Sequence, residues 1–236
     1  MMLIIYKIQI PFFEQYKSND YEWPWNTNAD EWKPFFNKVL LNVIFNITIV
    51  APIVLSIDAW VVGEVPFRFD VDSYPETYEI IWQILFFIVV EDIGFYWAHR
   101  LLHTKYFYGK IHKIHHDNKQ VHGIAAEYAH PLEYVFANGI PSSLGPKLLG
   151  MRCHVVTFWL WVAVRIFETV DGHSGYDFPW APYRLLPMAT NGRYHDYHHA
   201  ENIGNYGSFM TIWDTVFGTN TSYYRKQEAK KTAKAN

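Results

Sequence analysis

This sequence contains very little cysteine and carries a small net charge. Among its 236 residues there is one cysteine, Cys153, which excludes an intrachain disulfide and a cysteine-based zinc finger. The formal charge is only −3, from 20 basic and 23 acidic residues, without a basic run. Because nucleic-acid binding depends on many lysine and arginine contacts to phosphate, we expect no nucleic-acid partner.

Other signatures are absent as well. There is no GxGxxG motif, so the chain lacks the fingerprint of a nicotinamide or flavin site. Residues 1–13 lack the charged start and cleavage site of a signal peptide. Disorder is excluded because 19% of the residues are aromatic. At this length we expect a single domain over 1–236, with the histidine motifs within roughly 85–220 and a polar tail at 225–236.

Long uncharged runs are the first positive feature. Residues 39–57 form a run of nineteen without a charge, close to the about 20 that cross a bilayer core. A second apolar segment covers 80–98, interrupted by Glu91 and Asp92, and a shorter helical hairpin is expected near 132–167. The sequence therefore predicts an all-α integral-membrane fold. A buried helix of a soluble enzyme is the alternative for the first run.

The distribution of charge predicts an orientation. Residues 58–79 contain six acidic residues and one basic residue, whereas 99–120 contain five basic residues and one acid. Basic loops favour the cytoplasmic side of a membrane. We therefore expect the histidine-rich segments to form a cytoplasmic cap.

Histidine carries most of the functional information. Eight of the twelve histidines fall into three short patterns: His99 and His103; His112, His115 and His116; His195, His198 and His199. On a helix, residues three or four apart share a face, so each pattern turns two or three imidazoles toward one point. One such pair is common on solvated helices, but three in one chain predict a metal site.

The number of histidines predicts two metal ions. Structural zinc takes four ligands and catalytic zinc three, so eight histidines exceed one zinc site. Imidazole suits iron, zinc, copper and nickel, whereas calcium and magnesium require oxygen ligands. Beside apolar helices, a histidine-rich metal pair points to oxygen activation on a lipid.

Several motifs in one order carry a family resemblance. Besides the histidine patterns, they are 127–133 (EYAHPLE), 168–177 (ETVDGHSGYD), 202–206 (NIGNY) and 213–218 (WDTVFG). Together they resemble the sterol desaturase/fatty acid hydroxylase superfamily of integral-membrane di-iron oxidases, and within it the C-4 methylsterol monooxygenases. The resemblance covers roughly residues 10–224.

The resemblance implies a ligand set, cofactors and partners. It implies two iron ions, for which zinc is a substitute, held by His99, His103, His112, His115, His116, His173, His195, His198 and His199. It also implies O₂ as co-substrate and oxidation of a sterol methyl group or a related lipid. Electrons would come from an external NAD(P)H-linked donor through a cytochrome b5-like carrier. The implied location is the endoplasmic reticulum membrane.

Partners of the histidine rings are expected among nearby acids. Asp92, Asp117, Asp171 and Asp196 are the candidates by proximity in sequence. Two interpretations of His130 are open. It lies next to the metal ligands or the substrate, or it is a structural histidine. No role is assigned to His122 and His154.

Two other functions are open at this stage. In one alternative the chain is a structural subunit of a larger membrane complex, for example in the mitochondrial inner membrane. Such a subunit would keep the metal site but not necessarily the catalytic activity. A zinc-dependent membrane hydrolase is the weaker option, because the histidines outnumber the ligands of such a site.

Overall fold

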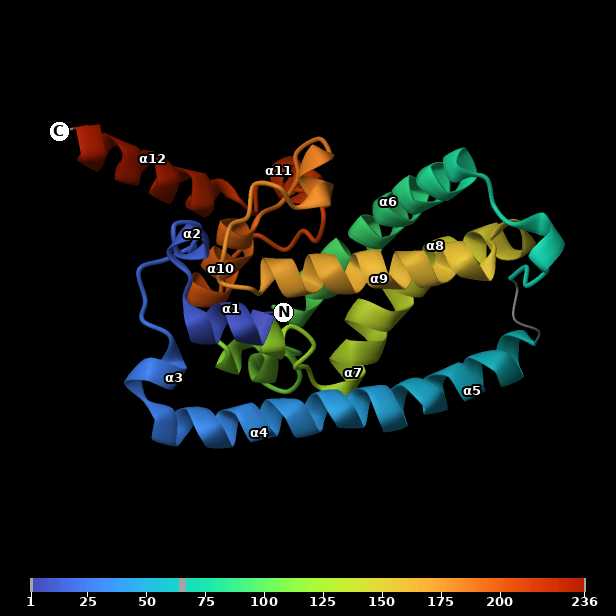
Figure 1. Cartoon of the computed structure of the whole chain (residues 1–236), viewed down its shortest axis with the longest axis horizontal. Helices are drawn as coiled ribbons and strands as arrows, with labels where there is room; N and C mark the ends of the chain where they lie inside the picture. Colours follow the sequence, from blue (N-terminus) through green and yellow to red (C-terminus); the bar gives the residue numbers. More distant parts are fainter. Residues whose placement is uncertain (1, 64–66, 236) are drawn as a thin grey trace.

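The computed structural model describes residues 2–63 and 67–235. The first residue of the expected single domain (residue 1), the last residue of the polar tail (residue 236) and part of the acidic segment 58–79 (residues 64–66) lie outside the described residues. Within the described residues the regular structure is helical, with three isolated β-bridges and no strand. The prediction of an all-α fold is confirmed (Figure 1). In chain order the elements are α1 (Met2–Ile8), α2 (Pro11–Glu14), α3 (Pro24–Thr27), α4 (Ala29–Phe45), η1 (Asn46–Val50), α5 (Ala51–Val62), η2 (Val71–Ser73), α6 (Thr77–Leu102), η3 (His112–Asp117), η4 (Gly123–Ala125), α7 (Pro131–Glu133), η5 (Tyr134–Gly139), α8 (Ile140–Leu149), η6 (Gly150–Arg152), α9 (Val155–Gly172), η7 (Pro182–Leu185), α10 (Gly192–Glu201), α11 (Ile212–Phe217) and α12 (Thr221–Ala235).

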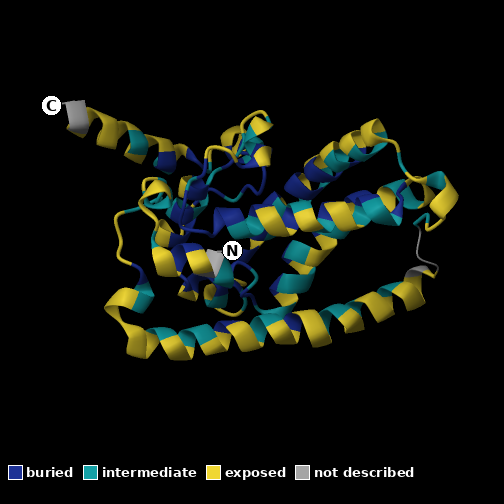
Figure 2. Cartoon of the chain, viewed as in Figure 1, coloured by how far each residue is buried: buried dark blue, intermediate teal, exposed yellow. Residues whose placement is uncertain are grey.

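The first apolar run forms one long helix, made of α4, η1 and α5. Its residues Ala29–Val61 are long and apolar enough to cross a membrane. These 33 residues extend about 50 Å at 1.5 Å per residue, so the helix is longer than the run at 39–57. Pro52, which has no N–H to donate, lies just after the π-helical turn η1. Most of the helix surface is exposed (Figure 2), as lipid contact requires.

Two asparagines attach this helix to the rest of the fold. Asn46 is fully buried, and its Nδ2 donates to the carbonyl oxygen of Ala129 at 2.9 Å. Asn42 Oδ1 accepts from the Ala129 N–H at 3.2 Å. The polar side chains inside the apolar run therefore hold one backbone segment, directly after Tyr128.

The second candidate membrane helix, α6, packs along α8. The two backbones approach most closely at Gly145, where an added Cβ would lie 2.8 Å from Phe87 Cδ1 and 3.0 Å from Phe87 Cα. A larger residue does not fit there. The hairpin expected near 132–167 forms with α7, η5 and α8 as one arm and α9 as the other.

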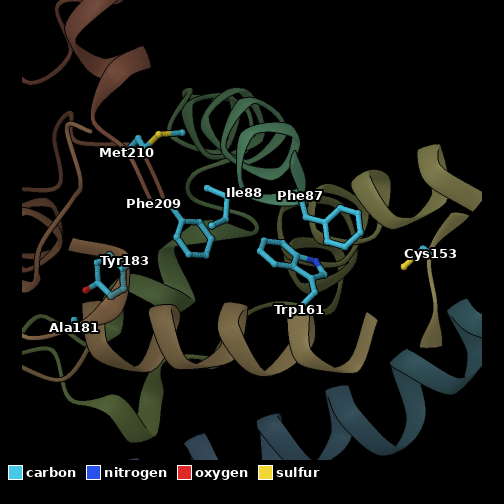
Figure 3. Close-up of a cluster of buried hydrophobic side chains, with 8 residues drawn as sticks. All are labelled: Phe87, Ile88, Cys153, Trp161, Ala181, Tyr183, Phe209 and Met210. Carbon is cyan, nitrogen blue, oxygen red and sulfur yellow. The ribbon is translucent and has the colours of Figure 1, made fainter. Parts of the chain in front are cut away.

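A hydrophobic core joins α6, α9 and the chain after α10 (Figure 3). Trp161 of α9 lies between Phe87 of α6 and Phe209, with ring centroids 5.8 Å apart in each pair. Its indole N–H donates to the Ser142 carbonyl at 2.7 Å. Burial of one such side chain contributes about 1.5–3 kcal/mol, so this cluster fixes the helices that carry the histidines.

The two ends of the chain behave differently. Near the N-terminus, the Tyr6 hydroxyl donates to the Ser174 carbonyl at 2.7 Å, and Tyr6 packs with Trp23 and Tyr176 over the loop that follows α9. The polar tail forms α12, which projects from the fold (Figure 1) and is mostly exposed (Figure 2).

Candidate metal centre

Four parts of the chain deliver the histidines. His99 lies in the last turn of α6 and His103 directly after it. His195, His198 and His199 lie on α10. His195 and His199, four residues apart, face one group of rings, as their helical spacing predicts, whereas His198 faces the other group. His173 is the residue after α9.

The middle pattern differs from its expected geometry. His112, His115 and His116 lie in η3, a 3₁₀-helical turn. Their rings divide between two groups, so this turn bridges them. The expectation of one common α-helical face is therefore wrong for this motif, although its residues still converge with the others.

The nine histidines form two groups, each with its ligand atoms within 4.8 Å of one another. The five-histidine group contains His99, His103, His112, His116 and His198. The four-histidine group contains His115, His173, His195 and His199. The structure thus brings all nine predicted residues together, in numbers suited to one metal ion per group.

Backbone carbonyls fix the orientation of four of these nine rings. The Nδ1 atoms of His99, His115, His173 and His198 hydrogen-bond to the carbonyl oxygens of Tyr206 (3.1 Å), Tyr128 (2.9 Å), Thr169 (2.8 Å) and Gly204 (2.6 Å), respectively. A carbonyl only accepts, so the hydrogen of each neutral ring is on Nδ1. The Nε2 atom of each ring therefore carries a free lone pair.

The Nε2 atoms within each group lie at close range, and in the pair formed by His115 and His173 both carry a free lone pair. Nε2 of His173 lies 3.1 Å from Nε2 of His115 and 3.0 Å from that of His195. In the other group, Nε2 of His103 lies 3.2 Å from that of His198. Lone pairs at this distance repel unless a cation lies between them. Two nitrogens about 2.1 Å from one metal ion at 90–109° would lie about 3.0–3.4 Å apart, so the residues fit a metal in each group.

Burial keeps the rings uncharged. It lowers the pKa of His103 to about 3 and that of His115 to about 4. The pKa values of His173, His195 and His199 are also lowered well below the usual range, by burial first and by neighbouring imidazoles second. Neutral imidazole is the form that binds a metal ion.

The four aspartates expected to hold the rings have other partners. Asp92 accepts from the Met210 N–H, Asp117 pairs with Lys38, Asp171 accepts from the Tyr183 hydroxyl and Asp196 accepts from Asn19. That expectation is wrong because proximity in sequence does not place a carboxylate beside a ring.

The acid that does hold a ring is Glu133. Its Oε1 lies 2.7 Å from His112 Nδ1, and both side chains are buried. Glu133 is the last residue of the EYAHPLE motif, but the sequence analysis gave it no role. The only signal for this role in the sequence is Pro131, which favours the start of a helix and so places Glu133 in the first turn of that helix.

The remaining histidines have local roles. His130 Nδ1 accepts from the Leu132 N–H and caps α7, which supports the structural interpretation of this residue. His154 caps α9 by accepting from the Val156 N–H at 3.1 Å. His122 is buried against Trp32 and Phe35.

A small cavity of about 40 Å³ adjoins both groups. Its lining includes His99 and His173 together with Phe95, Arg165 and Ser208. A cavity of this size holds a few molecules as small as water, since each needs about 10–15 Å³.

A buried ion cluster lies on one side of this cavity. Arg165 Nε donates to Glu91 at 2.7 Å and its Nη1 donates to Glu168 at 2.7 Å. The Ser208 hydroxyl lies 3.3 Å from Glu91. This cluster joins α6 to α9, and removal of one partner would leave a buried charge without compensation.

Several known proteins are similar to this chain in sequence. The model of the fatty acid hydroxylase family matches residues 84–219. A "putative methylsterol monooxygenase" of Dictyostelium discoideum is 37% identical over 223 residues, which cover 94% of this chain and 78% of the relative.

Plant relatives match over a shorter length. A very-long-chain aldehyde decarbonylase of Oryza sativa subsp. indica is 44% identical over 152 residues, 63% of this chain and 56% of the relative. Methylsterol monooxygenase 2-2 of Arabidopsis thaliana is 42% identical over 159 residues, 66% of this chain and 59% of the relative. No solved structure matches the chain.

Proposed function

This chain belongs to the fatty acid hydroxylase family, and from that premise we propose that it is a membrane-bound di-iron monooxygenase that uses O₂ to oxidise a methyl group of a sterol. The two inward-facing histidine groups are the observation that carries this proposal. Iron bound in them would supply O₂ activation and oxidation of an unactivated C–H bond.

The chain's own residues position and isolate the reaction. The nine histidines are the proposed ligands, five of them oriented through Nδ1 by four carbonyls and Glu133. The adjoining cavity, of about 40 Å³, has room for O₂. It is too small for a sterol, so productive binding requires the surrounding helices to separate.

The substrate is proposed to be a C-4 methyl sterol. Two of the relatives are named for methylsterols, and the EYAHPLE and HSGYD segments favour the same class. The rice relative is named for very-long-chain aldehydes, which need a similar apolar passage. A substrate assay should therefore compare a C-4 methyl sterol with a long-chain aldehyde.

Electrons are proposed to come from a cytochrome b5-like carrier linked to NAD(P)H. Lys105, Lys110 and Lys113 are exposed close to η3 in sequence, and this basic surface suits a carrier with an acidic face. We place the centre on the cytoplasmic side of the endoplasmic reticulum membrane. Protease protection of intact microsomes tests this orientation. Because α1 packs against the loop that contains His173, an epitope on α1 should be cleaved by added protease if the centre faces the cytoplasm, and should be protected if it faces the lumen.

The variant His198→Ala is expected to abolish O₂-dependent oxidation of the sterol. The loss of one ligand disturbs the metal site more than the packing of the membrane helices, so expression and membrane insertion should be retained. The measurement combines iron analysis of the purified protein with mass spectrometry of the product formed under ¹⁸O₂. The matched control is His130→Asn, which removes an imidazole outside both groups and keeps a side chain able to cap α7.

The same experiment distinguishes the alternative of a structural subunit. In that case His198→Ala would leave the activity of the assembly intact, and deletion of residues 225–236 would release the chain from a large membrane complex. Bound metal without turnover of either substrate, together with copurification of such a complex, would overturn the proposed monooxygenase activity.

A further inference from the structure

An oxidisable aromatic side chain lies against the five-histidine group. The Tyr206 ring centroid is 5.0 Å from that of His103, 5.5 Å from that of His99 and 5.7 Å from that of His198. The Tyr206 carbonyl also accepts from His99 Nδ1. Tyr206 is therefore placed to exchange an electron with a metal held by these rings.

Two further oxidisable rings continue from Tyr206 to the surface. The centroid of Tyr96 lies 6.3 Å from that of Tyr206, and the centroid of Trp97 lies 5.5 Å from that of Tyr96. Tyr96 is completely buried, whereas Trp97 is 47% exposed. Tyrosine and tryptophan are the aromatic side chains most easily oxidised by one electron, and rings this close exchange electrons readily.

The Tyr96 hydroxyl has a defined route for its proton. The Thr219 hydroxyl donates to Asp214 Oδ1 at 2.5 Å, so its single hydrogen is committed. Arg100 donates to the Tyr96 oxygen at 3.2 Å. The Tyr96 hydroxyl, 3.2 Å from Thr219 Oγ1, must therefore donate to Thr219, and Asp214 is the final acceptor.

We propose that Tyr206, Tyr96 and Trp97 form an electron path that reduces an oxidised metal centre when no substrate is bound, which protects the ligands from oxidation. This inference rests on the proposed di-iron function. It adds a second activity, in which the reductant reaches the protein at Trp97 rather than through the electron carrier used in turnover.

Electrons and protons balance along this path. One electron passes from Tyr206 to the metal centre, while the phenolic proton leaves to water beside this half-buried ring. Tyr206 is restored when it receives an electron from Tyr96 and takes a proton back from that water. Tyr96 gives up its electron as its proton moves to Thr219 and the Thr219 proton moves to Asp214. Both return when Trp97 is oxidised. Trp97 loses its Nε1 proton to solvent, and a phenolic reductant in the membrane restores it by donating the hydrogen atom of its O–H group.

The test uses the iron-loaded protein in phosphatidylcholine nanodiscs, without sterol, treated with hydrogen peroxide. Freeze-quench EPR detects tyrosyl radicals, and peptide mass spectrometry measures oxidation of Trp97 relative to Trp60. Trp60 is 86% exposed, so diffusible oxidants would modify it more than Trp97. Zinc-loaded protein gives the background.

In the wild-type protein we expect a tyrosyl signal and more oxidation at Trp97 than at Trp60. Tyr96→Phe should reduce Trp97 oxidation to the zinc-loaded background with iron content unchanged, and Thr219→Val should lower it in the same direction. The matched control is Tyr108→Phe, because the Tyr108 ring also contacts His103 at 5.6 Å but lies off the path. Its Trp97 oxidation should equal that of the wild type.

Oxidation of Trp97 that is unchanged in Tyr96→Phe, or that is lower than that of Trp60 in the wild type, would overturn the path. Sterol oxidation and iron content are measured on the same preparations. Their absence in the wild-type protein would count against the proposed function, whereas their presence with an unaffected Tyr96→Phe variant would reject the electron path alone.

Discussion

At the scale of single residues, the tautomers of the histidines determine what the site can bind. Glu133 is the one carboxylate among the described residues that hydrogen-bonds a ring of either group, and it fixes His112 with its lone pair directed inward. Four other rings are oriented by backbone carbonyls, which mutation of a side chain does not remove. Substitution of Glu133 is therefore the way to change the orientation of one ring, His112, without altering a histidine.

We expect Glu133→Ala to weaken metal binding about 10–100-fold, because the His112 ring loses the partner that sets its tautomer and angle. Competition of the purified protein with a chelator of known affinity measures this change. The matched control is Glu79→Ala, which removes a carboxylate paired with Arg68 away from both groups. Equal affinities in the two variants would show that Glu133 does not orient the ligand.

Eight of the nine histidines proposed as ligands were predictable from the sequence, because they lie at fixed spacing in three short patterns. The atoms that orient the rings were not, since the carbonyls of Tyr128, Thr169 and Gly204 carry no residue-specific signal. His173 illustrates the limit: it lies in a turn without a helical partner, so spacing gave it no role and only the family resemblance identified it.

At the scale of elements, the apolar runs predicted helices but not their ends or contacts. The run at 39–57 belongs to a helix that begins at Ala29, because residues 29–38 include four charged residues but are still helical. Asn42 and Asn46 are polar residues within this uncharged run, and both bind the backbone of Ala129. A contact between residues 83 positions apart leaves no local pattern.

The packing of α6 on α8 leads to a prediction at Gly145. Gly145→Val should destabilise the protein by about 1–3 kcal/mol or more, because the new side chain meets Phe87. Thermal unfolding in detergent measures this loss. Gly109→Ala is the control, since an added Cβ there has no neighbour within 4 Å. A Gly145→Val variant as stable as this control would mean that the two helices are farther apart.

At the scale of the whole molecule, a metal ion bound in each histidine group would act as a cross-link. The two groups draw their rings from α6, η3, α10 and the residue after α9, so bound metal ties distant parts of the chain together. A ligand that binds only the folded state stabilises it by about 2.7 kcal/mol when its concentration is 100 times its dissociation constant.

Removal of the metal by a chelator should therefore lower the unfolding temperature markedly. Zinc should restore stability without restoring sterol oxidation, because it binds imidazole but has no redox chemistry. Scanning calorimetry of the iron, apo and zinc forms gives the comparison. Identical unfolding temperatures for all three would indicate that the histidines do not share a cation.

The link between Asn46 and Ala129 also has a consequence for biosynthesis. Asn46 is made 83 residues before its partner, which at about 5–20 residues per second corresponds to about 4–17 s of translation. During that interval the Asn46 amide can donate to Asn42 Oδ1, which lies 3.3 Å away on the same helix, and the carbonyl that orients His115 is not yet made. We therefore expect the first helix to reach its final contacts, and the four-histidine group to bind a metal, only after Ala129 has been made.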